Sequence, residues 1–179
     1  MPIDPTRAFR PVRIALMKVA DNRTRTDDAA GDLIVSRANL AGHRVVARTR
    51  VPAELGAVVG QLRAWVDDPG VDCVIAAGGT GLSMRDVTPE AFALVWDKEI
   101  PGFGELFRSL SLGTVGTSAL ASRACAGVAG TTCLFALPGS PGGARDAWDG
   151  ILESQLDSRH RPCNLVELMA CATEEAERL

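Results

Sequence analysis

The sequence predicts a single α/β domain in which a parallel sheet is covered by helices on both faces. Apolar segments with the composition of doubly buried strands, at 12–19, 71–77 and 131–137, are separated by amphipathic segments with helical periodicity. The chain of 179 residues fits one domain that needs no disulfide or metal to fold. No linker or internal repeat divides it, and residues 1–11 and 164–179 form a flanking arm and tail.

The remaining elements follow from similar patterns. Segment 43–51 partly alternates arginine with apolar residues, which indicates a half-solvated or edge strand. Pro52 opens the helix that follows, and Thr88 caps a later one. Further helices are expected from Leu33 to Gly42, from about Glu105 to Val115, after Pro141 and over 164–179. Three tryptophans fall on apolar helical stripes and are expected in the core: Trp65, Trp96 and Trp148.

Composition excludes several classes of function. The formal net charge of −3 argues against nucleic acid as a partner, because many phosphate contacts need a basic surface. No apolar run is long enough to cross a membrane, and the first residues lack the apolar stretch of a secretory signal. The five cysteines have no CxxC spacing, which indicates reduced, mostly buried thiols in the cytoplasm. His43 and His160 have no spacing for metal or triad chemistry and are expected at the surface.

Two glycine-rich loops that follow predicted strands are the main candidates for a ligand site. The tetrapeptide GGTG at 78–81 and the segment 138–143 should share the carboxyl edge of the sheet with loop 20–28. Glycine adopts positive φ and lets a ligand approach closely, so successive N–H groups can converge on a phosphate. GGTG lacks the Lys-Ser/Thr pair of a P-loop, and Met84 interrupts a GxGxxG pattern. A purely structural turn is the alternative at 78–81.

One acidic residue follows the first glycine loop. Asp86 stands just before the helix expected at Thr88, where a carboxylate can hold a divalent cation against a polyphosphate. Alternatively, Asp86 only neutralises the positive end of that helix. Its neighbour Arg85 is either a phosphate ligand or a solvated surface charge.

Longer motifs extend this pattern over most of the chain. They read GGTGLSMRDVTPEAF at 78–92, PGFGELFRSLS at 101–111, GTSALASRACAG at 116–127 and LFALPGSPGGARDAW at 134–148. Together they resemble the molybdenum cofactor biosynthesis protein B family, a relative of the molybdopterin adenylyltransferases. The segment QLDSRHRPCNL at 155–165 resembles the protein B branch in particular, and ADNRTRTDDAAGDLI at 20–34 is a weaker match.

The resemblance implies a three-layer α/β sandwich of the molybdopterin-binding type that assembles into homo-trimers or homo-hexamers. Active relatives transfer AMP from Mg-ATP to molybdopterin, so ATP and Mg²⁺ would be needed if this chain is active. The resemblance places phosphate on Gly78, Gly79, Thr80 and Gly81. It makes Asp86 catalytic and a metal ligand, with Asp21 or Glu54 as a second carboxylate. The pterin side would be lined by Ser118, Ser122, Pro138, Gly139 and Ser140, with Glu105 as a further contact.

Four positions depart from the family pattern. Active adenylyltransferases carry Asp after the proline of a Pro-Asp-Glu or Pro-Asp-Asp string, where this chain has Ala53. The first loop has Ala20 in place of Ser, and Ala29-Ala30 stands where relatives have Thr-Ser. Loss of a preorganised catalytic group costs on the order of 10²–10³ in rate. Two hypotheses therefore stay open, an adenylyltransferase and a catalytically degenerate molybdopterin-binding carrier or regulator. In a third hypothesis, the chain is an oligomeric α/β protein whose glycine loops are only structural turns.

Overall fold

A computed structural model describes residues 3–20 and 28–169 and contains a six-stranded sheet of order β2-β1-β3-β6-β5-β4. The four strands from β2 to β6 are parallel, while β5 is antiparallel to both β6 and β4. The strands are β1 Arg13–Val19, β2 Arg44–Val51, β3 Cys73–Ala77, β4 Lys98–Glu99, β5 Cys125–Ala129 and β6 Thr132–Leu137. As expected, β2 is an edge strand.

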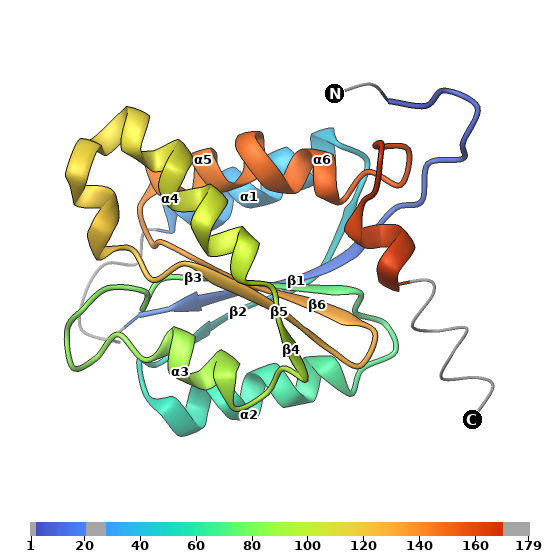
Figure 1. Cartoon of the computed structure of the whole chain (residues 1–179). Helices are drawn as coiled ribbons and strands as arrows, with labels where there is room; N and C mark the ends of the chain where they lie inside the picture. Colours follow the sequence, from blue (N-terminus) through green and yellow to red (C-terminus); the bar gives the residue numbers. More distant parts are fainter. Residues whose placement is uncertain (1–2, 21–27, 170–179) are drawn as a thin grey trace.

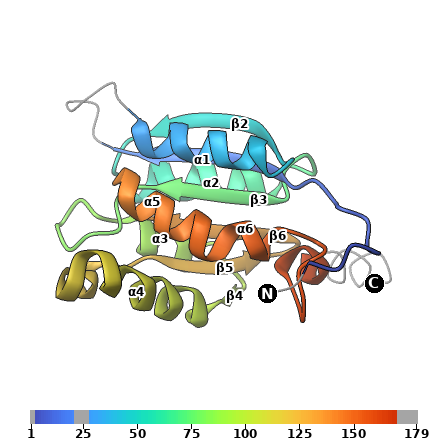
Figure 2. The same cartoon turned by 90° about the horizontal axis from the view of Figure 1, so that it is seen from above.

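Helices cover both faces of this sheet. Figure 1 shows α1, α4, α5 and α6 on one face and α2 and α3 on the other, and Figure 2 shows the same layers from above. The helices are α1 Ala29–Leu40, α2 Leu55–Val66, α3 Thr88–Ala93, α4 Pro101–Val115, α5 Pro141–Ala147 and α6 Glu153–Gln155. A 3₁₀ turn, η1 Gly116–Ala121, follows α4, and a π turn, η2 Trp148–Leu152, joins α5 to α6. This is the three-layer α/β sandwich with a mostly parallel sheet that the sequence predicts.

Alternate residues of the central strands supply two separate cores. In β1, Ile14 and Leu16 pack toward α1 and α5, while Ala15 and Met17 pack toward α2. Because successive strand side chains point to opposite faces, a strand between two helical layers must be apolar at every position. Phe135 of β6 is fully buried and meets Phe103 edge-on, with ring centroids 5.3 Å apart. Burial of such a ring contributes about 2–3 kcal/mol.

Several element boundaries differ from the sequence expectation. The second helix begins at Leu55, not at Pro52, because Glu54 is its N-cap in extended conformation. The fourth begins at Pro101 rather than near Glu105. Thr88 is the first residue of α3, and its hydroxyl donates to the carbonyl of Gly78 (2.7 Å) instead of capping the helix. Strands β4 and β5 have no counterpart in the sequence expectation.

The predicted core residues are mostly confirmed. Trp65 and Trp148 are buried, and Trp96 packs against the core on the α2 side. Cys73 and Cys133 are buried neighbours on β3 and β6, and burial raises the pKa of the Cys133 thiol to about 12. Cys163 is exposed, contrary to expectation. No helix among residues 3–20 and 28–169 is long and apolar enough to span a membrane.

Both histidines are buried, so the expectation of surface histidines is wrong. His43 is 4% exposed and His160 is 6% exposed. Nδ1 of His43 accepts a hydrogen bond from the backbone N–H of Val12 (3.2 Å), and its ring lies between Phe9 and Trp148. The N-terminal arm covers this region, because Ile3 pairs with His160 and the N–H of Arg10 donates to Ser158 Oγ (2.9 Å).

We predict that His43 makes stability depend on pH. Burial lowers the pKa of His43 below its ordinary value of 6.5, although the carboxylate of Asp157 opposes this effect. Below pH 6.5 this histidine is therefore protonated in the unfolded chain but still neutral in the folded protein. The free energy of unfolding that is present above pH 6.5 is lost as the pH falls. His43→Asn keeps an acceptor near the Nδ1 position without titrating there. Urea unfolding between pH 7 and pH 5 should show a steeper loss for wild type, by up to about 1.4 kcal/mol per pH unit. Equal slopes in the two proteins would contradict this prediction.

Candidate functional site

The carboxyl ends of the four parallel strands place the predicted loops at one edge. In the register of the sheet, Val19 of β1 pairs with Val51 of β2, and Ala77 of β3 pairs with Leu137 of β6. The N–H of Gly78 donates to the carbonyl of Leu137 (2.9 Å). A Cβ added to Gly139 would lie 3.2 Å from the Cα of Gly78. The two glycine-rich loops are therefore in direct contact, as expected. Asp21 and loop residues 21–27 lie outside the described residues.

All four carbonyls of the GGTG loop are bound by the protein. Those of Gly78 and Gly79 accept from the hydroxyl and the N–H of Thr88, at 2.7 and 3.0 Å. The carbonyl of Thr80 accepts from the N–H of Arg123 (3.0 Å), and that of Gly81 accepts from its Nε (2.7 Å). Because a peptide carbonyl and the following N–H point in opposite directions, the N–H groups at 79–82 are turned away from α3 and Arg123.

The N–H of Gly81 faces the carboxylate of Asp86, whereas no described residue accepts from the N–H groups of Gly79, Thr80 and Leu82. Successive N–H groups without partners form a cavity for an anion, and the positive φ of Gly78 (+107°) and Gly79 (+68°) makes this turn possible. The loop therefore has backbone donors that an anion could accept from.

Asp86 helps to hold the same loop. Its Oδ2 accepts from both the N–H (2.9 Å) and the hydroxyl (2.6 Å) of Ser83. The hydroxyl of Ser83 lowers the pKa of Asp86 most, followed by the N–H groups of Ser83 and Gly81 and by the charge of Arg123, whereas partial burial opposes them. The carboxylate is therefore ionised at neutral pH.

Arg123 is a component of the site that sequence reasoning missed. Besides its bonds to Thr80 and Gly81, its guanidinium donates to the carbonyl of Asp86 and forms an ion pair with Glu90 of α3. It joins the beginning and the end of the loop from 37 to 42 residues away in sequence. The only signal in the sequence was its position inside the motif GTSALASRACAG.

The residues expected on the pterin side are only partly brought together. Glu105 and Ser122 line one hollow of about 430 Å³ beside Arg123, together with Arg108 of α4. Pro138 and Gly139 belong to the loop against Gly78. Two other expected residues have different surroundings: Ser118 is exposed in η1, and Ser140 caps α5 by accepting from the N–H of Gly143 (3.2 Å).

The second carboxylate expected from Glu54 is not in the position of the missing aspartate. Glu54 is exposed, and both it and Ala53 precede the helix α2. Glu54 is extended, so its side chain points away from the side that Ala53 occupies, where the methyl group packs on the core. Asp28, on the same edge, has charged partners: Lys18 Nζ lies 3.4 Å from Oδ1, and Arg48 Nη2 lies 2.7 Å from Oδ2.

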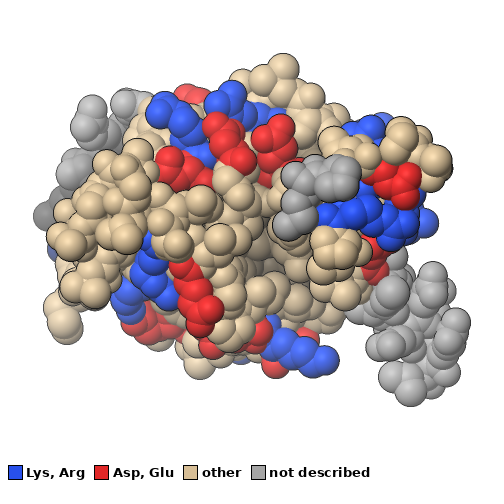
Figure 3. Space-filling model, turned by 45° about the horizontal axis from the view of Figure 1, so that its top comes forward, with Lys and Arg blue, Asp and Glu red and all other residues tan. Residues whose placement is uncertain are grey.

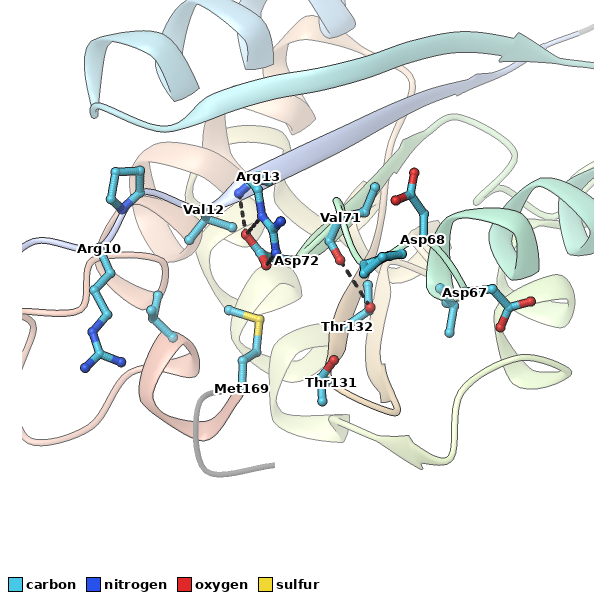
Figure 4. Close-up of a pocket in the computed structure, with 14 residues that line it drawn as sticks. Arg10, Val12, Arg13, Asp67, Asp68, Val71, Asp72, Thr131, Thr132 and Met169 are labelled. Carbon is cyan, nitrogen blue, oxygen red and sulfur yellow. Dashed lines mark hydrogen bonds and ion pairs between the residues drawn. The ribbon is translucent and has the colours of Figure 1, made fainter. Parts of the chain in front are cut away.

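A different hollow, of about 500 Å³, lies at the opposite edge, where β1, β3 and β6 begin (Figure 4). Two of its charged groups bind one another: Arg13 donates to both carboxylate oxygens of Asp72, at 2.6 to 2.9 Å. Asp68 accepts from the N–H of Gly70 (2.7 Å). The carboxylates of Asp72 and Asp68 in this hollow are therefore already bound within the protein.

Comparison with known proteins shows which family the chain belongs to. A family model described as "Probable molybdopterin binding domain" matches residues 15–158. The chain belongs to this family. It is 46% identical to the molybdenum cofactor biosynthesis protein B of Escherichia coli (strain K12) over 156 residues, 87% of this chain and 92% of that protein. It is 40% identical to the protein of that name from Bacillus subtilis (strain 168) over 146 residues, 81% of this chain and 86% of that protein.

Solved structures of this family have the same fold. A crystal structure of a molybdenum cofactor biosynthesis protein B superposes with a TM-score of 0.80 at 36% identity, covering 97% of this chain and 100% of that chain. A tungsten cofactor synthesizing protein from Pyrococcus furiosus superposes with a TM-score of 0.72 at 30% identity, covering 82% and 94%. These findings support a role of the chain in molybdenum cofactor biosynthesis.

Proposed function

We propose that this protein binds molybdopterin during cofactor biosynthesis, with the terminal phosphate on the GGTG loop. The observation that carries the proposal is the set of N–H groups at Gly79 and Thr80, which have no acceptor among the described residues while every carbonyl of the loop is bound. Backbone donors held in place before the ligand arrives bind an anion without reorganisation. The pterin would extend from there along Pro138 and Gly139.

Adenylylation of molybdopterin is the second candidate function, and the ionised carboxylate of Asp86 beside the phosphate loop favours it. Within the described residues, no three His, Cys, Asp or Glu side chains gather in a way that could hold a metal ion. A single carboxylate suits Mg²⁺ that is held mainly by the phosphates of ATP. When bound, the metal would neutralise charge between the two phosphorylated reactants. Asp86 would orient it, and the loop N–H groups would hold the attacking phosphate.

The absence of an acid at position 53 favours binding without turnover. We expect the purified protein to bind molybdopterin but to release no pyrophosphate when Mg-ATP is added. Ala53→Asp restores a carboxylate at this edge, where the start of α2 tolerates an acid, and should yield measurable pyrophosphate release and bound adenylate. The matched control is Ala57→Asp, within α2. Rapid pyrophosphate release by the wild-type protein would instead establish the adenylyltransferase.

We also propose that the protein is a homo-oligomer, a trimer or a hexamer. Large apolar side chains are exposed along α4 and η1, and Figure 3 shows a largely uncharged surface over these elements on its left side. They are Leu106, Leu110, Leu112, Val115 and Leu120, the last 89% exposed. A second copy of the chain would cover such a patch. Light scattering should give a mass three or six times 18.8 kDa, and Leu120→Asp should lower it. A monomeric wild type would contradict the proposal.

A further inference from the structure

The segment between the GGTG loop and Asp86 carries two exposed apolar side chains. Leu82 is 73% exposed and Met84 is 98% exposed. We call residues 82–85, which lie between β3 and α3 in Figure 1, the rim loop. Outside α4 and η1, no other segment of the described chain exposes two large apolar side chains so fully. Neighbouring apolar side chains with this exposure indicate a surface that another protein covers.

The hydrogen bonds of Ser83 hold the rim loop to its own end. The N–H and the hydroxyl of Ser83 donate to Asp86 Oδ2, and its carbonyl accepts from the N–H of Asp86 (3.0 Å). Neither Leu82 nor Met84 belongs to the two cores of the domain. Contact with a further protein would therefore fix the segment that leads from the phosphate loop to the carboxylate of Asp86.

The rim loop and the surface of α4 carry opposite charges. Arg85 is exposed in the rim loop, whereas Glu105 is exposed on α4. Glu105 lies on the same face of α4 as Leu112, because residues seven positions apart are separated by two helical turns. The guanidinium of Arg108, the other charged group of α4, is turned back toward the carbonyl of Ser122. Two copies that met through α4 alone, or through the rim loop alone, would place like charges in one interface.

The two surfaces lie on different layers of the fold. α4 and η1 cover one face of the sheet, and the rim loop leads into α3 on the other face (Figure 1). A contact between two different surfaces of the same chain joins copies head to tail, and it closes into a ring when the rotation between copies allows it. The rim loop of one copy and α4 of the next form such a pair, with apolar side chains and opposite charges on the two sides.

We propose that the rim loop of one copy docks on α4 of the next copy, and that this contact completes the phosphate site. The inference rests on the proposed homo-oligomer and the proposed molybdopterin site, and it names the contact that joins them. Met84 of one copy covers the exposed side chains of Leu106 and Leu112 of the next. Because the docked segment runs directly from the GGTG loop to Asp86, assembly and molybdopterin binding strengthen each other.

Two variants that each lack one half of the contact test it. Met84→Asp alters the rim loop and Leu112→Asp alters α4, and both positions are exposed, so each variant should fold. Light scattering should give each variant alone a lower mass than wild type. In an equimolar mixture, an affinity tag on one variant should retain the other, because one intact pair of surfaces remains. The control Leu40→Asp, at a similarly exposed position of α1, should keep the wild-type mass.

The same variants test the link to the ligand. Leu112 belongs neither to the glycine loops nor to the hollow beside Arg123. We nevertheless expect Leu112→Asp to bind molybdopterin about fivefold or more weakly than wild type, since it loses the neighbouring copy. By the same coupling, molybdopterin should raise the mass of the wild-type protein at dilutions at which the unliganded oligomer dissociates.

The outcomes separate this contact from the proposed function. The proposal is overturned if Met84→Asp keeps the wild-type mass, if the two variants do not combine, or if Leu112→Asp binds molybdopterin as wild type does. A loss of mass in Leu112→Asp but not in Met84→Asp would identify a contact between two α4 surfaces and also overturns it. If an oligomeric wild type does not bind molybdopterin, the proposed function fails, and the mixing experiment alone decides the contact.

Discussion

Gly78→Ala should destabilise the protein by about 3 kcal/mol or more. Gly78 has φ of +107°, a conformation that alanine rarely adopts, and an added Cβ would lie 2.4 Å from the backbone carbonyl oxygen of Val19. Neither atom is at the end of a flexible side chain, so the strand β1 or the loop must move. Urea denaturation followed by circular dichroism measures the effect.

A matched glycine in a helix provides the control for this substitution. A Cβ at Gly113 of α4 meets nothing within 4 Å, so Gly113→Ala should be neutral or slightly stabilising. The account of the loop fails if Gly78→Ala unfolds at the same urea concentration as wild type. It also fails if both alanine variants lose stability equally.

Arg123→Ala should lower stability by about 2 kcal/mol and weaken molybdopterin binding at least tenfold. The substitution leaves the carbonyls of Gly81 and Asp86 without their donors and removes the ion pair with Glu90. Once those carbonyls are released, the peptide units of the loop can rotate, and their N–H groups no longer point at one anion. Thermal unfolding and titration with molybdopterin report the two effects separately.

Arg108 is the matched control, because it lines the same hollow as Arg123. With the described part of the chain it makes only one hydrogen bond, a long one of 3.5 Å to the carbonyl of Ser122. Arg108→Ala should leave the loop intact and change stability by less than about 0.5 kcal/mol. Arg123→Lys should recover part of the binding, since one donor can still reach a carbonyl. Unchanged molybdopterin affinity in Arg123→Ala would show that the loop holds its shape without the guanidinium.

The sequence predicts the central layers well because its strands are buried on both faces. β1, β3 and β6 are apolar at nearly every position, so they are recognisable one at a time. β5 reads CAGVA and is recognisable only in the fold, where a Cβ on Gly127 would lie 2.5 Å from the ring of Trp96. Small residues under a tryptophan give no periodic signal, and β4 is only two residues long.

The site was predictable at its glycine loops but not in the groups that orient them. Glycines directly after a buried strand indicate where an anion can approach. The orientation of the loop depends on contacts between residues that are distant in sequence. Arg123, just before β5, donates to the carbonyl of Gly81, and the hydroxyl of Thr88 donates to the carbonyl of Gly78. The sequence predicts His43 at the surface because Phe9 and Trp148, which cover it in the fold, are distant from it in sequence.

A crystal structure of the protein with molybdopterin bound is the most direct test of the anion site. We predict that oxygens of the terminal phosphate will lie within hydrogen-bond distance of the N–H groups of Gly79 and Thr80, with the pterin beside Gly139. A ligand phosphate bound elsewhere, with those two N–H groups facing only water, would contradict the account.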